Sequence, residues 1–202
     1  MKPRLDPTMQ KGSIENELDE VIVLANTMKR QVLEIRRAGQ ILCDVVSRNG
    51  CIYWCGNGGS SSESSHLAAE LVGRYEQERR PISSHALTVD TSAMTAIAND
   101  YGFEEAFARQ IQAHGRREDA LVALSTSGMS QNVIRCVEEA RHIGLKTIGL
   151  VGCDGGRLAE EVDVVIRVES ERTSRIQEMH LIVGHILCGI IENSSTNITE
   201  GR

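Results

Sequence analysis

The sequence lacks long hydrophobic runs, and this absence limits where the protein can act. No stretch approaches the roughly 20 apolar residues that a membrane-spanning helix requires. The first 20 residues contain no apolar segment of the kind that forms a secretory signal. We therefore expect a cytoplasmic protein that has no membrane partner.

Runs of lysine and arginine are absent as well. The formal net charge is −6, with 22 basic residues against 28 acidic ones. A protein that binds nucleic acid through its phosphates usually presents a basic patch, so this balance argues against such a partner. At 202 residues, with 41% hydrophobic and 25% charged side chains, the chain is suited to one globular domain.

The cysteines form no recognisable metal or disulfide pattern. Cys51 and Cys55 lack the spacing of a zinc-binding pair, and no second pair follows them. Without a secretory signal, buried free thiols are the expected state. The six cysteines are Cys43, Cys51, Cys55, Cys136, Cys153 and Cys188.

Hydrophobic periodicity predicts a helical segment and then alternating strands and helices. Between residues 13 and 48 apolar positions recur every three or four residues, and Gly39 either bends this helix or divides it in two. Its apolar positions exceed one narrow stripe, so the core or another subunit covers a second side. Five short apolar runs follow, each succeeded by a helical pattern: residues 51–55, 85–89, 120–124, 146–152 and 163–168.

This alternation predicts an α/β fold. The expected architecture is a doubly wound, five-stranded parallel sheet flanked by helices, over residues 41–202, with an N-terminal helical extension over residues 1–40. Sheets of this kind bind ligands beyond the carboxyl ends of their strands, where the strand order reverses.

Two loops at predicted strand ends favour a phosphate ligand. GNGGSSS (residues 56–62) follows the first run, and STSGMS (residues 125–130) follows the third. Glycines let backbone N–H groups approach a ligand, and hydroxyls beside a helix N-terminus hold phosphate without a lysine. Neither loop has the spacing of a dinucleotide or nucleotide triphosphate site. Either loop alone is more often structural, but both at one sheet edge favour phosphate binding.

Two helical segments carry the other candidate groups. His66 and Glu70 are four residues apart, so they lie on one helix face, where they suit either metal binding or proton transfer. Near the C-terminus, RIQEMHLIVGHILCGII (residues 175–191) reads as a buried helix interrupted by Gln177, His180 and His185. A buried amide or imidazole requires a partner.

These segments together resemble a known family. GNGGS, HLAAELVGRY, TAIANDYGFEEAFARQ, ALSTSGMSQNVI, GLVGCDGGRLA and RIQEMHLIVGHIL are similar, in this order, to the SIS (sugar isomerase) domain family. Within it, the combination of HxxxE with RIQExHxxxxH resembles the phosphoheptose isomerases. The similarity extends over nearly the whole chain, to about residue 192.

The resemblance implies an aldose–ketose isomerase with one zinc ion per site. The expected reaction converts D-sedoheptulose 7-phosphate to D-glycero-D-manno-heptose 7-phosphate, the first step toward nucleotide-activated heptose for surface polysaccharides such as lipopolysaccharide. It also implies a homo-oligomer, most simply a tetramer, with sites completed across subunit interfaces. The implied metal ligands are His66, Glu70, Gln177 and His185, of which Glu70 and His185 also act as catalytic residues.

The resemblance also implies a set of substrate contacts. They are Asn57, Gly58, Gly59, Ser60, Glu70, Arg74, Asn99, Asp100, Ser125, Thr126, Ser127, Ser130 and Gln177. The sequence departs from the family pattern at two positions. Met129 stands where asparagine is frequent, which removes one possible loop hydrogen bond, and Ser174 stands where some members have aspartate.

Spacing within the last helix restricts its metal ligands. Gln177 and His185 are eight residues apart, about 12 Å along an ideal helix and about 80° around it. They meet at one ion more easily if Gln177 lies at a distorted helix start, or if the two come from different subunits. His180 lies about 140° from His185 and is interpreted as a buried structural histidine.

Two other functions remain open at this level. One is a non-catalytic SIS protein that binds a replication initiator, and such relatives lack the catalytic acid and histidine that Glu70 and His185 supply here. The other is a different sugar-phosphate isomerase or a sugar-phosphate-sensing domain. Little of the chain lies outside the predicted domain, so we expect no linked transferase or DNA-binding module.

Overall fold

A computed structural model describes residues 13–199 of the chain, with side chains as far as Ser195. The sheet within this part has five parallel strands in the order β2-β1-β3-β4-β5. All five predicted strands are present, although the second ends at Ala86 and does not extend to residue 89. The strand order reverses direction between β1 and β3. The strands are β1 Ile52–Cys55, β2 Ser84–Ala86, β3 Ala120–Ser125, β4 Lys146–Gly152 and β5 Val164–Val168.

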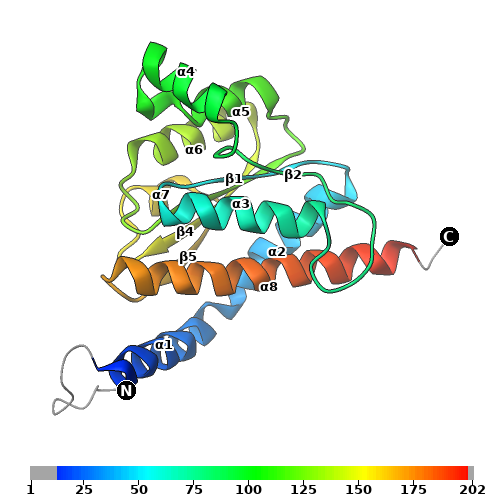
Figure 1. Cartoon of the computed structure of the whole chain (residues 1–202). Coiled ribbons are helices and arrows are strands. Elements are labelled where there is room, and N and C mark those ends of the chain that lie inside the picture. Colours follow the sequence, from blue (N-terminus) through cyan, green and yellow to red (C-terminus); the bar gives the residue numbers. More distant parts are fainter. Residues whose placement is uncertain (1–12, 200–202) are drawn as a thin grey trace.

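Helices cover both faces of this sheet (Figure 1). On one face lie α2 Val32–Ser47, α3 Gly59–Val72 and α8 Thr173–Thr199. On the other lie α5 Ala108–His114, α6 Gln131–Ile143 and α7 Leu158–Glu161, with α4 Thr91–Tyr101 and the short helix Phe103–Glu105 outside them. No helix within residues 13–199 is long and apolar enough to cross a membrane.

Two hydrophobic clusters lie on the two sides of the sheet, because alternate strand residues point in opposite directions. In β1, Trp54 joins the cluster beneath α2, α3 and α8, whereas Tyr53 and Cys55 join the cluster beneath α5 and α6. Trp54 is fully buried and donates its indole N–H to Ser84 Oγ at 2.9 Å. The strands are thus buried on both faces, as parallel strands usually are.

The N-terminal helical segment is divided, but not where the sequence suggested. The interruption is a 3-10 turn at Lys29–Gln31 between α1 Ile14–Met28 and α2. Gly39 lies inside α2, where a Cβ atom would stand 2.9 Å from Ile190 Cδ1. This glycine therefore allows α2 to approach α8 and does not divide the helix.

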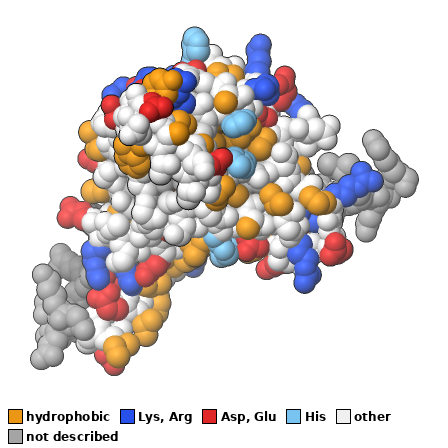
Figure 2. All heavy atoms as spheres, turned by 45° about the horizontal axis from the view of Figure 1, so that its top comes forward, with side chains coloured by type: hydrophobic (Ala, Val, Ile, Leu, Met, Phe, Trp, Pro, Cys, Tyr) orange, Lys and Arg blue, Asp and Glu red, His pale blue; other side chains and the backbone are white. Residues whose placement is uncertain are grey.

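The two halves of this segment have different surroundings. α2 packs against α8 and the sheet, and it crosses the expected domain boundary at residue 40. α1 projects from the body (Figure 1), and its exposed apolar side chains follow the projecting helix in Figure 2. Residues 1–12 of the expected extension lie outside the described part of the chain.

All six cysteines are free thiols, as expected. Cys55, Cys136 and Cys188 are buried, and Cys43 and Cys51 are partly buried. Cys153 is exposed, so the expectation of burial is wrong there. It lies directly after the end of β4 at Gly152, in a turn where its φ is 44°, and so is not part of the buried strand.

Candidate active site

A pocket lies at the carboxyl edge of the sheet, where β1 and β3 are neighbours and the strand order reverses. Its volume is about 280 Å³. Both predicted loops reach it, which confirms that they meet at one sheet edge. The lining residues are Asn57, Gly58, Gly59, Ser60, Leu124, Ser125, Thr126, Ser130, Thr173 and Gln177.

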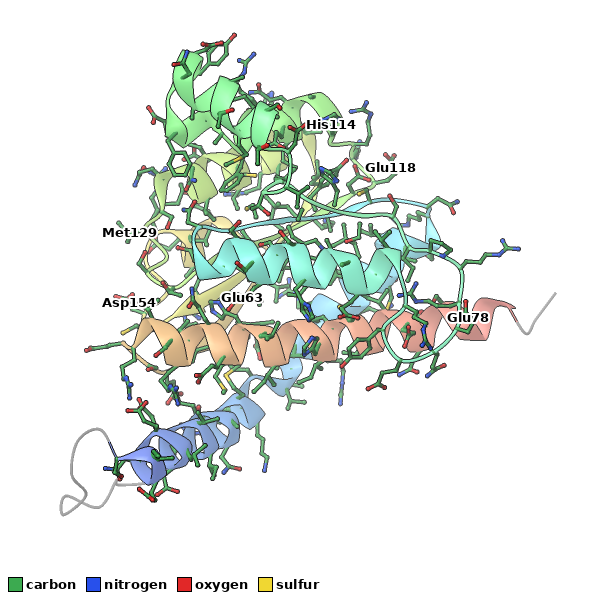
Figure 3. All side chains as sticks on the ribbon, in the orientation of Figure 1. Glu63, Glu78, His114, Glu118, Met129 and Asp154 are labelled. Atoms are coloured by element: carbon green, nitrogen blue, oxygen red, sulfur yellow. The ribbon has the colours of Figure 1, made fainter. Side chains whose placement is uncertain are left out.

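Hydrogen bonds between hydroxyl and backbone groups shape the loop after β3. Ser125 Oγ donates to Ser130 Oγ at 3.1 Å and accepts the N–H of Gly128 at 3.1 Å. Gly128 has a φ of 65°, and a Cβ atom there would stand 1.8 Å from the Gly155 carbonyl oxygen. Met129 occupies the outer side of this loop at the same sheet edge (Figure 3) and is exposed.

The loop is followed at once by α6, for which Ser130 is the N-cap. Ser130 makes no side-chain hydrogen bond to that helix, so its hydroxyl is directed to the loop instead. A helix N-terminus carries about half a positive charge and favours an anion. The pocket therefore suits a phosphate held by hydroxyl and N–H donors.

A pair of amides fixes the first loop against α6. Asn57 Nδ2 donates to Asn132 Oδ1 at 2.8 Å, and Asn132 Nδ2 donates to Asn57 Oδ1 at 2.8 Å. Asn132 is buried in the first turn of α6. The helix after this loop begins at Gly59 and not near Glu63, as the sequence had suggested.

From this pocket, α3 and α8 run side by side. A Cβ atom on Gly184 would stand 2.4 Å from Leu67 Cδ1, and one on Gly59 would stand 2.4 Å from Gln177 Nε2. The two helices can approach this closely because both positions are glycine. The contact places side chains of α3 opposite side chains of α8 in a fixed register.

Opposite one another in this register are three groups that could hold a metal ion: His66, Glu70 and His185. One ligand atom from each lies within 4.8 Å of the others. The Nε2 atoms of His66 and His185 are 2.8 Å apart, and His66 Nε2 lies 3.5 Å from Glu70 Oε1. Two imidazole nitrogens and one carboxylate are ligands that zinc accepts in catalytic sites, which leave one position open for substrate. These residues therefore fit the expected ion.

Gln177 lies at the pocket, apart from these three groups. Helix α8 includes residues 173–199 without interruption, so Gln177 is not at a distorted start. It is two turns, about 12 Å, before His185, and helical side chains point toward the N-terminus. Its amide therefore points away from the His66, Glu70 and His185 group of the same chain.

Four further predicted residues do not line the pocket. Ser127 is in the loop after β3, where its Oγ accepts the N–H of Met129 at 3.1 Å. Arg74 is exposed just beyond α3. Asn99 and Asp100 lie on α4, across the sheet from α3 (Figure 1), where Asn99 Nδ2 donates to Asp100 Oδ1 at 2.8 Å.

His180 is buried, as the sequence suggested, with 1% of its surface exposed. Neither ring nitrogen makes a hydrogen bond to a described residue. Burial lowers the pKa of His180 to about 4, and the backbone of Val151 counters this shift without reaching hydrogen-bond geometry. His180 therefore stays neutral, in keeping with its interpretation as a buried structural histidine.

Sequence reasoning missed Glu63 and Tyr75. Glu63 lies on the side of α3 that faces α8 (Figure 3), and burial raises its pKa to about 7, with Ser60 partly offsetting the shift by a hydrogen bond. The Tyr75 ring stacks on His185, with ring centroids 5.6 Å apart. Neither residue had a distinguishing spacing. Each is recognisable only once α3 and α8 are placed together.

Comparison with known proteins gives consistent matches. A family profile described as SIS domain matches residues 18–152, which include both loops, His66 and Glu70 but not α8. A phosphoheptose isomerase of Rhodospirillum rubrum is 51% identical over 160 residues, which cover 79% of this chain and 85% of the relative.

Two solved structures extend this similarity to most of the fold. The phosphoheptose isomerase of Neisseria gonorrhoeae is 38% identical with a TM-score of 0.84, covering 89% of this chain and 97% of that chain. The corresponding protein of Francisella tularensis is 34% identical with a TM-score of 0.86, covering 89% of this chain and 96% of that chain.

Proposed function

The chain belongs to the phosphoheptose isomerases, a family of SIS domain proteins, and from this membership we propose how its pocket and its histidine–carboxylate group act together. As a phosphoheptose isomerase it is an aldose–ketose isomerase whose substrate is sedoheptulose 7-phosphate. We propose D-glycero-D-manno-heptose 7-phosphate as the product and the cytoplasm as the compartment.

One observation carries the assignment of roles: the pocket and the histidine–carboxylate group lie along the same α3–α8 contact. Ser60 borders the pocket and His66 follows six residues later on α3, about 9 Å along the helix. A substrate whose phosphate occupies the pocket can therefore extend along this contact toward His66 and His185. A seven-carbon chain suits this separation, because its phosphate and its carbonyl are at opposite ends.

The phosphate end is held by the pocket. Hydroxyls of the loop after β3, the N-terminus of α6, and Ser60 provide donors without a cationic side chain in the lining. Neutral donors at a helix end bind phosphate while leaving it free to depart as part of the product. Gln177 of the same chain also lines this pocket, where it is placed to bind a sugar hydroxyl.

The reacting end is held by His66, Glu70 and His185. Isomerisation moves a proton between C1 and C2 of the sugar, and Glu70 is the group proposed to carry that proton. His185 is proposed to transfer the proton of the neighbouring oxygen. A zinc ion held by these residues would stabilise negative charge on that oxygen. The non-catalytic alternative has no support here, because the acid and the histidine that it lacks are both in place.

We propose that the subunits form a tetramer in which neighbouring chains complete each site. Asn99, Asp100 and Gln177 are expected substrate or metal contacts, yet none reaches the His66, Glu70 and His185 group within one chain. Helix α4, which carries Asn99 and Asp100, has no buried residue among its described members. An uncovered helix with ligand-type side chains is consistent with a role in a neighbouring subunit's site.

The direct test is an NMR assay with purified protein and sedoheptulose 7-phosphate. We expect heptose 7-phosphate to appear with wild-type protein, to stop after chelation and to return when zinc is added. A protein that binds the substrate but gives no product after zinc addition would contradict the proposal. Fructose 6-phosphate is the matched control. Its chain is one carbon shorter, so it should connect the phosphate pocket with the His66, Glu70 and His185 group less well and should be converted more slowly.

A further inference from the structure

The imidazole of His185 is bounded by aromatic rings on two sides. Tyr75 stacks on it, with ring centroids 5.6 Å apart and an angle of 23° between the planes. His66 meets it edge-on, with centroids 5.0 Å apart and an angle of 74°. Tyr75 therefore restricts rotation of the ring whose Nε2 faces His66.

Tyr75 is held in place by a buried carboxylate on α8. Glu192 is 1% exposed and accepts three consecutive backbone N–H groups, from Tyr75 at 3.0 Å, Glu76 at 2.8 Å and Gln77 at 2.9 Å. Burial alone would raise the pKa of Glu192, but these N–H groups and Arg79 hold the pKa below its ordinary value. The backbone at Tyr75 is thus anchored to the same helix that carries His185.

Arg79 links this anchor to the helix of Glu70. Arg79 Nε lies 3.2 Å from Glu192 Oε1, and both side chains are 2% exposed. Its Nη2 donates to the Glu70 carbonyl at 2.7 Å, and its Nη1 donates to the Leu71 carbonyl at 2.9 Å. The last carbonyls of a helix have no partners within the helix, and a guanidinium there satisfies them. One ion pair therefore fixes both the end of α3 and the segment that follows it.

We propose that Tyr75 is a positioning residue for the isomerase reaction. Its ring holds the His185 imidazole in the orientation that presents Nε2 to His66 and to the substrate, and the Glu192–Arg79 pair holds Tyr75 against His185. The inference rests on the proposed role of His185 in the reaction.

A purely structural role for this segment would not require the stack. Besides pairing with each other, Glu192 accepts backbone N–H groups of this segment and Arg79 donates to backbone carbonyls of α3, so none of these contacts involves the side chain at residue 75. A ring placed on His185 adds an orientational constraint at the reacting group. Small losses of orientation at a catalytic group cost large factors in rate.

The test compares Tyr75→Leu with Tyr75→Phe. Phenylalanine keeps the stacking ring, so its kcat should remain within about twofold of wild type. Leucine removes the ring, and we expect kcat to fall about tenfold with little change in KM, because the phosphate pocket is untouched. Zinc affinity should weaken about tenfold in the leucine variant alone, as it does when a group that orients a metal ligand is lost.

A second readout does not depend on turnover. In metal-free protein, the ring-proton NMR signals of His185 should shift in Tyr75→Leu, which loses the neighbouring ring current, and should stay near their wild-type positions in Tyr75→Phe. Wild-type kcat and zinc affinity in Tyr75→Leu would overturn the proposal, and so would equal losses in both variants. His185→Gln, assayed in parallel, tests the proposed role of His185 itself, since full activity there would refute that role and not the stack.

Discussion

Three histidines on α3 and α8 show how surroundings decide the chemistry of one residue type. His66 and His185 face each other with Nε2 atoms 2.8 Å apart beside a carboxylate, where a proton or a metal ion can be shared. His180 is on the same helix as His185 but is buried against the sheet, without a hydrogen bond to a described residue. The first two are suited to chemistry and the third to packing.

Glu70→Gln should abolish turnover while the fold and phosphate binding remain. The amide keeps the shape of the side chain but cannot accept the proton, and loss of acid–base catalysis costs roughly 10²–10⁴-fold in kcat. Steady-state kinetics and phosphate titration of the same sample separate the two effects. Near-normal kcat would remove Glu70 from the role of proton carrier.

The buried His180 should make the protein less stable as pH falls from 6.5 to 4. Its pKa is about 4 when folded against an ordinary value of 6.5, so the unfolded chain binds more protons in this window. The free energy of unfolding should drop by about 3 kcal/mol from this group. Glu63 acts in the opposite sense, because its raised pKa means that the folded state takes up the proton between pH 4.5 and 7.

The His180 contribution is isolated by difference. Denaturant unfolding at several pH values gives the free energy of unfolding of wild type and of His180→Leu. As pH falls, the wild type should lose more stability than the leucine variant, so the difference between the two should shift in favour of leucine. If the difference between the two free energies of unfolding does not change between pH 4 and 6.5, His180 does not titrate as its burial implies.

At the scale of elements, the loop after β3 combines several weak donors. Neutral hydrogen bonds contribute about 0.5–1.5 kcal/mol each, so one lost hydroxyl should be tolerated and several should not. Phosphate affinity measured by calorimetry should fall only a few-fold in Thr126→Ala. It should be nearly lost in a variant with alanine at Ser125, Thr126, Ser127 and Ser130, provided circular dichroism shows that it folds. Normal binding there would place the phosphate elsewhere.

The segment after α3 is an element held by one buried ion pair. Breaking such a pair by removing one charge typically costs 3–5 kcal/mol, so Glu192→Gln should lower the free energy of unfolding by about 3 kcal/mol or more. Exposed Glu76→Gln, which keeps its backbone N–H to Glu192, is the matched control and should change little. Denaturant unfolding measures the stability of both variants. If Glu192→Gln is as stable as Glu76→Gln, the ion pair does not stabilise the fold.

The sheet and its loops could be predicted from sequence because their signals are local. Apolar runs mark strands, and Gly and Ser after a strand mark a ligand loop. The turn at Lys29–Gln31 had no such signal, and it replaced the expected division at Gly39, whose lack of a side chain serves packing against Ile190. The helix was expected to bend or divide at Gly39 because a glycine can interrupt a helix. A glycine can also allow close packing of two helices, and the sequence alone does not distinguish these two roles.

The site was predictable in its residue types but not in its grouping. His66 and Glu70 could be paired by their four-residue spacing, whereas His185 joins them through the contact of α3 with α8 across 119 residues. Tyr75 and Glu192 are 117 residues apart and meet for the same reason. Periodicity reports which face of a helix is apolar, but not the register in which two helices pack.

For the whole molecule, the row of exposed apolar residues on α1 is the surface that we expect the proposed assembly to bury. Ile14, Leu18 and Ile22 are 77%, 60% and 58% exposed and lie four residues apart, so they form one stripe. We expect a homotetramer in sedimentation analysis. A fully active monomer would contradict the assembly and the sharing of sites together.

A double variant, Leu18→Lys with Ile22→Lys, should weaken the assembly and reduce activity with it, because charges on the stripe oppose burial. Asp19→Lys also introduces a lysine on α1, but about 100° around the helix from Leu18, and serves as control. A double variant that keeps the wild-type mass would place the interface elsewhere and leave α1 outside it.

Gln177, His180, His185 and Glu192 all lie on α8, which is one uninterrupted helix. This restricts where related chains can differ in length. Inserting or deleting a single residue between Gln177 and Glu192 would rotate everything beyond it by about 100° and shift it by about 1.5 Å. Such a change would at once separate His185 from His66 and Glu192 from the segment it anchors. Length differences between related chains should therefore accumulate in the connections and at the ends, while the interval from Gln177 to Glu192 keeps a constant number of residues.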